Sequence, residues 1–166
     1  MAEDTLYEER LTSLRTELLF VFLMLVAAGL CAWRVSLRGW DWLAILCLCI
    51  SAMFLFYVLN YRVLHITLTS STLTVRFSFM PWRIPLSTIS GCRQDDISLW
   101  RIGGAGIHFS SFARRYRAMF NFLEYPRVIV ELKEKRGLVR DIAFTTRQPE
   151  KLMRLLEEGM GRAGTS

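Results

Sequence analysis

Two long apolar blocks near the start of the chain constrain its fold more than any other feature. The first covers residues 18–35 (LLFVFLMLVAAGLCAWRV) and the second covers residues 42–61 (WLAILCLCISAMFLFYVLNY), and Arg34 is the one charged residue in them. A helix of about 20 apolar residues is long enough to cross the roughly 30 Å hydrocarbon core of a bilayer. The blocks therefore predict a transmembrane helical hairpin over residues 18–61.

Two other interpretations of these blocks fit less well. A helical hairpin buried in a soluble protein normally keeps a polar stripe at helical spacing, whereas both blocks are apolar on every side. Aromatic residues stand near the block ends, where amphipathic rings favour the headgroup region of a membrane: Trp33, Trp40, Trp42, Tyr57 and Tyr61. A cleaved signal peptide would begin with basic residues. Residues 1–17 instead contain five acids and two arginines, a net charge of −3, and we interpret them as an acidic N-terminal segment.

Short runs of alternating apolar and polar residues follow the second block. This period of two predicts strands in residues 63–69, 73–80, 82–93, 103–112, 127–135 and 138–146. The chain then closes with TTRQPEKLMRLLEEGMG, in which Thr146 suits a helix cap and Leu152, Leu155, Leu156 and Met160 form one apolar stripe. We expect an amphipathic C-terminal helix that covers the open end or edge of a small antiparallel sheet.

This order of elements, together with the motifs WRIPLSTISG, GGAGIHFSSF and RVIVELKEKRGLVRDIAFTTRQPEKLMRLLEE, resembles the bacterial pleckstrin-homology-like (PH-like) domain membrane proteins that carry an N-terminal transmembrane hairpin. The resemblance covers residues 63–158. It implies an α+β membrane protein, in which a PH-like antiparallel β-barrel or sheet over residues 62–166 follows the hairpin and is capped by the C-terminal helix. It further implies a binding or assembly module and not a catalyst.

The turn between the first two predicted strands departs from the lipid-binding relatives. Phosphoinositide-binding PH domains of eukaryotes gather Lys and Arg around this turn. The corresponding stretch here, TLTSSTLTV, has no basic residue before Arg76. No inositol-lipid headgroup site can therefore be transferred to this chain by position.

Residues that usually perform catalysis or bind metals are sparse. His65 and His108 are the only histidines, and neither has a Cys, Asp or Glu at ligand spacing. Three of the four cysteines lie in the apolar blocks, and Cys92 stands alone. The GGAG turn lacks the Lys-Ser/Thr of a phosphate-binding loop, and the adjacent Asp95 and Asp96 suit a turn or cap. We expect no enzyme activity and no metal, nucleotide or redox cofactor.

The positive charge of the chain lies after the hairpin. Seventeen Lys and Arg residues follow Tyr61 against nine Asp and Glu residues, a net charge of +8. A basic domain held at a bilayer is attracted by anionic headgroups, at about 1 kcal/mol per basic group near the surface. Nucleic acid would also suit this charge, but the sequence contains no recognition motif for it, and we expect no nucleic-acid partner.

The distribution of arginines predicts the orientation in the membrane. Basic residues near the outer ends of the hairpin outnumber those in its connecting loop by four (Arg10, Arg15, Arg62, Arg76) to two (Arg34, Arg38). Basic flanking segments stay on the cytoplasmic side. We therefore expect an integral protein of the bacterial inner membrane, with the soluble domain and both termini in the cytoplasm.

The candidate residues for binding a lipid or a partner lie mainly in residues 112–127, FARRYRAMFNFLEYPR, which mix arginines with aromatic residues. This mixture suits a membrane interface, and the candidates are Arg114, Arg115, Arg117, Phe120 and Phe122. Trp82 and Arg83, within the proline-bounded FMPWRIP, form a second candidate of the same kind. The alternative is a strand and a loop whose aromatic side chains fill the core while the arginines are solvated.

Two functional interpretations remain open. The first is a membrane-anchored, non-catalytic PH-like module that engages an anionic lipid surface, a membrane-protein partner or another copy of itself. The second is a small accessory or structural subunit of a larger membrane complex. Small residues in the apolar blocks, at 27–29 and 51–52, permit helix packing in either case.

Overall fold

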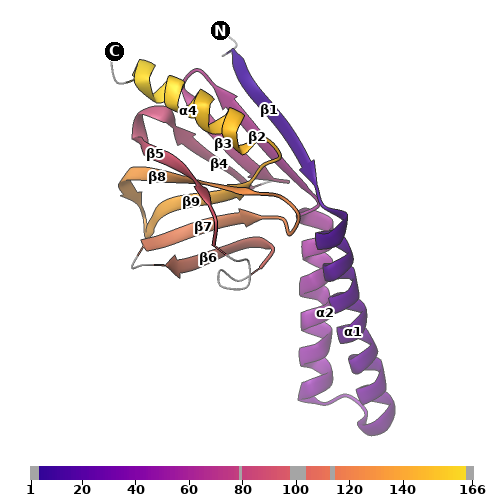
Figure 1. The fold of residues 1–166 in the computed structure, drawn as a ribbon. Helices are drawn as coiled ribbons and strands as arrows, with labels where there is room; N and C mark the ends of the chain where they lie inside the picture. Colours follow the sequence, from indigo (N-terminus) through magenta and orange to yellow (C-terminus); the bar gives the residue numbers. More distant parts are fainter. Residues whose placement is uncertain (1–3, 79, 98–103, 113–114, 164–166) are drawn as a thin grey trace.

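The computed structural model describes residues 4–78, 80–97, 104–112 and 115–163, and it shows an α+β protein (Figure 1). Two long helices project from one end of a β domain, and the C-terminal helix lies against that domain. The α-helices of the described residues are α1 (Leu14–Arg38), α2 (Trp42–Asn60) and α4 (Pro149–Ala163). All three were expected from the sequence.

Helices α1 and α2 form the predicted hairpin, with residues 39–41 between them. They have 25 and 19 residues, and at 1.5 Å per residue they are about 37 Å and about 28 Å long. Ser13 and Asp41 cap their first turns by accepting hydrogen bonds from the backbone amides of Thr16 and Ala44. In the most apolar 18-residue segment of each helix, only 17% (α1) and 6% (α2) is buried. Each helix is therefore long and apolar enough to cross a membrane, and neither serves as a buried core helix.

The first strand, β1 (Thr5–Thr12), precedes the helices in the chain and belongs to the β domain. It pairs antiparallel with β2 (Val63–Thr69), the first strand after the helices. Thr12 stands opposite Val63 at the ends of these strands that adjoin the helices. The helical hairpin is therefore an insertion between two neighbouring strands of one sheet.

The contacts of β1 make it a full part of the domain. Tyr7 and Leu11 are 6% and 0% exposed, and burial raises the pKa of Tyr7 to about 12. Glu9 accepts hydrogen bonds from the hydroxyls of Tyr7 and Thr146, at 2.7 and 2.6 Å, and from the backbone amide of Arg147 at 2.9 Å. The sequence of residues 1–17 does not predict this strand, because the charged Glu9 interrupts the apolar face that Tyr7 and Leu11 form.

Two open sheets form the β domain, and neither closes into a barrel. The first sheet has the order β1-β2-β3-β4, with β3 at Thr72–Phe77 and β4 at Met80–Pro85. The second has the order β5-β8-β9-β7-β6, and its strands are β5 (Ile89–Asp95), β6 (Gly106–Phe112), β7 (Arg115–Asn121), β8 (Arg127–Arg136) and β9 (Val139–Thr145). The short helix η1 (Leu86–Thr88) leads from the first sheet to the second.

One strand pairing differs from the antiparallel arrangement expected from the sequence. β7 pairs with β9 in parallel, while the other described pairings are antiparallel. After β7 the chain forms β8 at a distance of two strand positions. β9 then fills the gap between β7 and β8. β9 consequently runs in the same direction as β7, which the alternation of side chains could not reveal.

The main core lies between the two sheets and α4. Burial alternates along β2, as its sequence pattern predicts. Helix α4 covers the core with Leu152 and Leu156, both 0% exposed. Gly159 allows the helix to approach η1 closely, because a Cβ atom there would lie 2.7 Å from Cδ1 of Leu86. The predicted role of the amphipathic C-terminal helix is thus confirmed.

Candidate functional site

Arg117, the best described of the three arginines expected to contact lipid, is buried. It is 2% exposed, and its guanidinium lies 3.7 Å from Asp95 and 3.5 Å from Asp141. Arg127, 5% exposed, lies 3.2 Å from Asp95 and donates a hydrogen bond to the backbone carbonyl of Ile97. These charges occupy the face of the second sheet that is turned away from the main core. Burial of Arg117 is incompatible with the surface contact expected of it.

Phe120 and Phe122 are core residues. They are 2% and 1% exposed, and their rings lie 6.2 and 5.3 Å from the ring of Phe77. Neither ring has surface with which to enter a membrane. The structure instead follows the alternative in which these aromatic side chains fill the core.

The remaining candidates are dispersed. Arg114 lies outside the described residues, and Arg115 is the first residue of β7. Trp82 is half-buried against Phe120, with the Arg136 guanidinium 5.2 Å from its ring centroid, and Arg83 is exposed. Trp82 and Arg83 line a cavity of about 380 Å³ at the rim of the two sheets. The structure does not bring these residues together with residues 112–127 into one basic surface.

A different cluster of cations surrounds a cavity of about 730 Å³ where the first sheet meets the helices. The helix ends contribute Leu14, Glu17, Leu59 and Asn60 to its lining. The strands and their flanks contribute Arg10, Thr12, Arg62, Val63, His65, Arg76 and Ser78. We call this the junction cavity. The helix ends thus border it on one side and basic side chains on the other.

Strand register places three basic side chains of the junction cavity in one row. Arg10 of β1 stands opposite His65 of β2, and His65 stands opposite Arg76 of β3. Residues directly opposite on neighbouring strands point to the same side, with Cβ atoms about 5 Å apart. The neighbours Leu11 and Leu64 point into the core, so alternation turns the basic row outward.

The junction cavity has a surplus of positive charge. Glu17 forms an ion pair with Arg62 at 3.0 Å. Within the part of the chain that the structure describes, Arg10 and Arg76 have no ion pair with a carboxylate. Like charges so close on one sheet face repel each other. An anion placed between them would relieve this repulsion.

His65 lies between the two unpaired arginines. Its pKa is lowered from the usual 6.5, first by burial and then by the positive charges of Arg76 and Arg10. A neutral imidazole carries one N–H donor and one acceptor nitrogen. An anion in the cavity would favour the protonated form, which has two donors.

The backbone at the rim of the junction cavity is unusual at Ser78, between β3 and β4. Its φ is 43°, in the left-handed region that residues with a Cβ rarely occupy. Strain of this kind often accompanies binding sites. Here it turns the chain beside the basic row.

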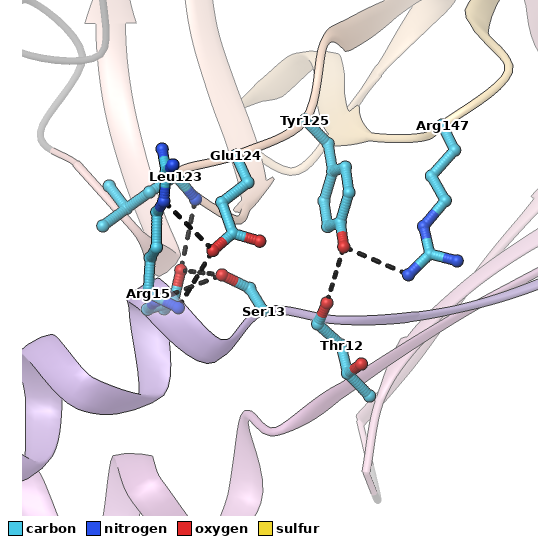
Figure 2. Close-up of polar contacts among 8 residues, drawn as sticks. Thr12, Ser13, Arg15, Leu123, Glu124, Tyr125 and Arg147 are labelled. Carbon is cyan, nitrogen blue, oxygen red and sulfur yellow. Dashed lines mark hydrogen bonds and ion pairs between the residues drawn. The ribbon is translucent and has the colours of Figure 1, made fainter.

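Polar contacts between the loop after β7 and the start of α1 fix the domain on the helices (Figure 2). Glu124 accepts a hydrogen bond from the backbone amide of Arg15 at 3.0 Å. The hydroxyl of Tyr125 donates to the carbonyl of Thr12 at 2.8 Å and accepts from Arg147 at 3.1 Å. Because these contacts hold the β domain against the start of α1, the junction cavity stays at the level of the helix ends.

Comparison with protein-family models, curated proteins and solved structures yields no match for this chain. Among the described residues, no group of three or more His, Cys, Asp or Glu side chains could hold a metal ion. The chemistry of the junction cavity is therefore that of arginine, histidine and hydroxyl groups. Guanidinium groups of this kind form charge-assisted hydrogen bonds with anions.

Sequence patterns identified only part of the junction cavity. Alternation along residues 63–69 and 73–80 predicts that His65 and Arg76 point away from the core. Their neighbour Arg10 was missed, because residues 1–17 carried no strand assignment. A signal for β1 does exist in the spacing of the buried Tyr7 and Leu11, four residues apart on the same side of an extended chain.

Proposed function

We propose that this chain is a membrane-anchored, non-catalytic PH-like binding module whose junction cavity takes the anionic headgroup of a lipid. One observation carries the proposal. The same cavity is lined by the ends of two helices long enough to cross a membrane and by an outward row of Arg10, His65 and Arg76.

Along the membrane normal, the junction cavity lies at the level that a lipid headgroup occupies. Helices that cross a bilayer end near its polar interface. Leu14 and Asn60, the terminal residues of α1 and α2 on the domain side, both line the cavity. A lipid phosphate at this level can reach the arginines without leaving the bilayer. Guanidinium groups form strong, charge-assisted hydrogen bonds with phosphate oxygens.

The strand arrangement supports the PH-like part of the proposal. The described strands form two open sheets of four and five strands. Helix α4 follows the last of them and covers the core. A sheet capped by the final helix is what the resemblance implies.

Charge supports a cytoplasmic domain in a bacterial inner membrane. The domain side of the helices carries Arg10, Arg62 and Arg76. At the opposite end, Arg34 is paired with Asp41 at 2.8 Å, which offsets its charge. Basic residues near the domain-side ends of the helices thus outnumber Arg34 and Arg38 at the other end, and such an excess favours the cytoplasmic side.

Lipid titration of the full chain tests the headgroup site. We would purify the chain in a neutral detergent and use native mass spectrometry to count bound short-chain phosphatidylglycerol. Parallel titrations use phosphatidylcholine of the same chain length and inorganic phosphate. We expect phosphatidylglycerol to bind more tightly than either. Substituting Arg10→Gln or Arg76→Gln should each remove about 1 kcal/mol, which is roughly a fivefold loss of affinity.

Arg154→Gln is the matched control, because Arg154 is exposed on α4, outside the cavity lining. Its affinity should equal that of the parent. Inorganic phosphate binding as tightly as phosphatidylglycerol would instead indicate a soluble anion as the ligand. Equal binding of the two lipids, or no loss in either arginine variant, would eliminate the headgroup site. A stoichiometric protein partner in mild detergent would then favour the accessory-subunit interpretation.

A further inference from the structure

A second part of the domain lies at the level of the helices. We infer that β6, the last strand in the described order of the second sheet, lies in the membrane interface, with Phe109 and Tyr116 contacting the boundary between headgroups and acyl chains. The partner of this surface is the lipid bilayer itself. The inference rests on the membrane-spanning role of α1 and α2, but it does not depend on anion binding in the junction cavity.

The start of β6 fixes its depth. A Cβ atom at Gly106 would lie 3.3 Å from Cε1 of Tyr57 and 3.6 Å from Cζ of Phe20. Tyr57 is three residues before the end of α2, and Phe20 is six residues after the start of α1. At 1.5 Å per residue, these rings lie roughly 5–9 Å inside the helix ends. Gly106 therefore lies at the level of the aromatic rings near the ends of the apolar blocks, where a spanning helix meets the headgroups.

Figure 1 shows the course of β6 from this point. The strand lies beside the domain-proximal turns of the helices and leads away from them, and among the described strands it pairs with β7. Its other edge faces the side on which the helices extend. A bilayer crossed by the helices would consequently meet β6 before it met any other strand of the second sheet.

Exposed aromatic side chains accompany this edge. Phe109 is 58% exposed, and Tyr116, on the neighbouring strand β7, is 45% exposed. Phe109 stands opposite Ala118 and Tyr116 stands opposite Ser111, so the two rings share one face of the sheet as diagonal neighbours. Aromatic rings of this kind are enriched at membrane interfaces, and exposed apolar rings in water gain no such contact.

Backbone chemistry limits how far β6 enters the bilayer. The unpaired N–H and C=O groups of an edge strand require hydrogen bonds, which the hydrocarbon core cannot supply. Water and headgroup oxygens in the interface can supply them. β6 should therefore lie among the headgroups and not in the hydrocarbon core.

This contact gives the domain two separate supports on one bilayer. The first is the fixed attachment of the domain to α1, and the second is β6, displaced to one side of the helices. Two supports prevent the domain from tilting about the helices. The junction cavity is thereby kept open toward the headgroups.

Photocrosslinking of the full chain tests the inference. Phe109 is replaced by p-benzoylphenylalanine, and the protein is reconstituted in vesicles of phosphatidylcholine alone or with phosphatidylglycerol. After irradiation, intact-protein mass spectrometry counts lipid adducts. Phe109 is exposed, so this replacement leaves the core unchanged. The positive control replaces Phe56 of α2, 47% exposed, and the negative control replaces Leu138 of the β8–β9 turn, 73% exposed.

We expect lipid adducts at position 109 at no less than half the yield at position 56, in both vesicle compositions. Position 138 should give at least tenfold fewer, because β9 lies two strand spacings, about 10 Å, from β6. Adduct yields at 109 equal to those at 138 would overturn the inference. So would crosslinks from 109 to a second protein chain, which would show the edge pairing with protein. Because neutral vesicles lack the anionic ligand, failure of the headgroup site would leave the result at 109 unchanged.

Discussion

Arginines on the outward faces of the two sheets have opposite surroundings. On the first sheet, Arg10 and Arg76 are exposed beside the junction cavity. On the second sheet, Arg117 and Arg127 are 2% and 5% exposed and lie near the buried Asp95. Burial alternates along β3, which holds Arg76, whereas β8, which begins with Arg127, is buried on both faces over its first four residues. What covers the face, and not the alternation, decides whether an arginine is available to a ligand.

The cost of burying a charge explains why the buried and the exposed arginines have different partners. A charge taken out of water is tolerated only when an opposite charge and hydrogen bonds replace its hydration. Arg117 has Asp95 and Asp141 within 3.7 and 3.5 Å. Arg76 keeps its hydration and has no such requirement. Its charge is therefore free for an anion that arrives from outside.

The largest effect should follow from removing β1, which serves both the first sheet and the core. A chain beginning at Arg62 loses Arg10 from the cavity and the buried Tyr7 and Leu11 from the core. Each buried side chain contributes about 1.5–3 kcal/mol, a large part of a typical total of about 5–15 kcal/mol. We expect this chain not to fold, as judged by near-ultraviolet circular dichroism and protease resistance.

A second variant tests the role of β1 by keeping this strand and removing the two helices. Thr12 and Val63 are already opposite each other, so a four-residue turn can replace residues 13–62 and make an ordinary β-hairpin. This chain should fold in water without detergent. Equal behaviour of the two chains would contradict the role given to β1.

Removing a buried arginine should destabilise the protein far more than removing an exposed one. Arg117→Gln leaves Asp95 and Asp141 without this guanidinium, at a cost of about 3–5 kcal/mol in the free energy of unfolding. Arg76→Gln should change it by less than about 0.5 kcal/mol. Denaturant titration in mild detergent compares the variants. Similar losses in both would show that the two faces do not differ.

Removing the acid of the junction cavity should strengthen lipid binding. Glu17 is paired with Arg62 at 3.0 Å, so Glu17→Gln frees a cation and removes a negative charge. Affinity for phosphatidylglycerol should rise about fivefold, corresponding to about 1 kcal/mol. Native mass spectrometry measures the change, with phosphatidylcholine as the reference. Weaker binding in this variant would mean that the lipid does not occupy the cavity.

The smallest effect concerns pH. The pKa of His65 lies below 6.5 in the folded protein, so the unfolded chain takes up its proton first as pH falls through 6.5. His65 therefore lowers stability toward acid. An anionic lipid raises this pKa, and its affinity should accordingly increase as pH falls below 6.5. In His65→Gln this dependence should disappear, and its persistence would assign the titration to another group.

Some features of the fold could be predicted because local patterns encode them. The block at residues 42–61 matches α2, Trp42–Asn60, and alternation over residues 63–69 matches β2. The stripe in residues 149–163 predicts α4. Strand β3 ends at Phe77, earlier than expected, because the chain turns at Ser78 with a φ of 43°.

Residues 112–127 show where local patterns fail. Their mixture of arginines and aromatic residues fits either a membrane surface or a strand and loop that fill the core, and the described residues among them belong to the end of β6, to β7, to a loop and to the start of β8. Phe120 faces the main core from β7 while Arg117 faces the opposite side. Composition gives the mixture of side chains in a strand, and only the neighbouring strands determine which face each side chain occupies.

By itself, the sequence determined the two apolar helices, the strand periodicity after them and the amphipathic closing helix. These features depend on contacts between residues close in the chain and on the period of apolar residues. The tertiary structure decided which strands are neighbours, which outward face is covered, and that Arg10 of β1 joins His65 and Arg76 across the helical insertion. Strand pairing across an inserted hairpin and the burial of a face arise from residues distant in the chain, whose proximity no local pattern records.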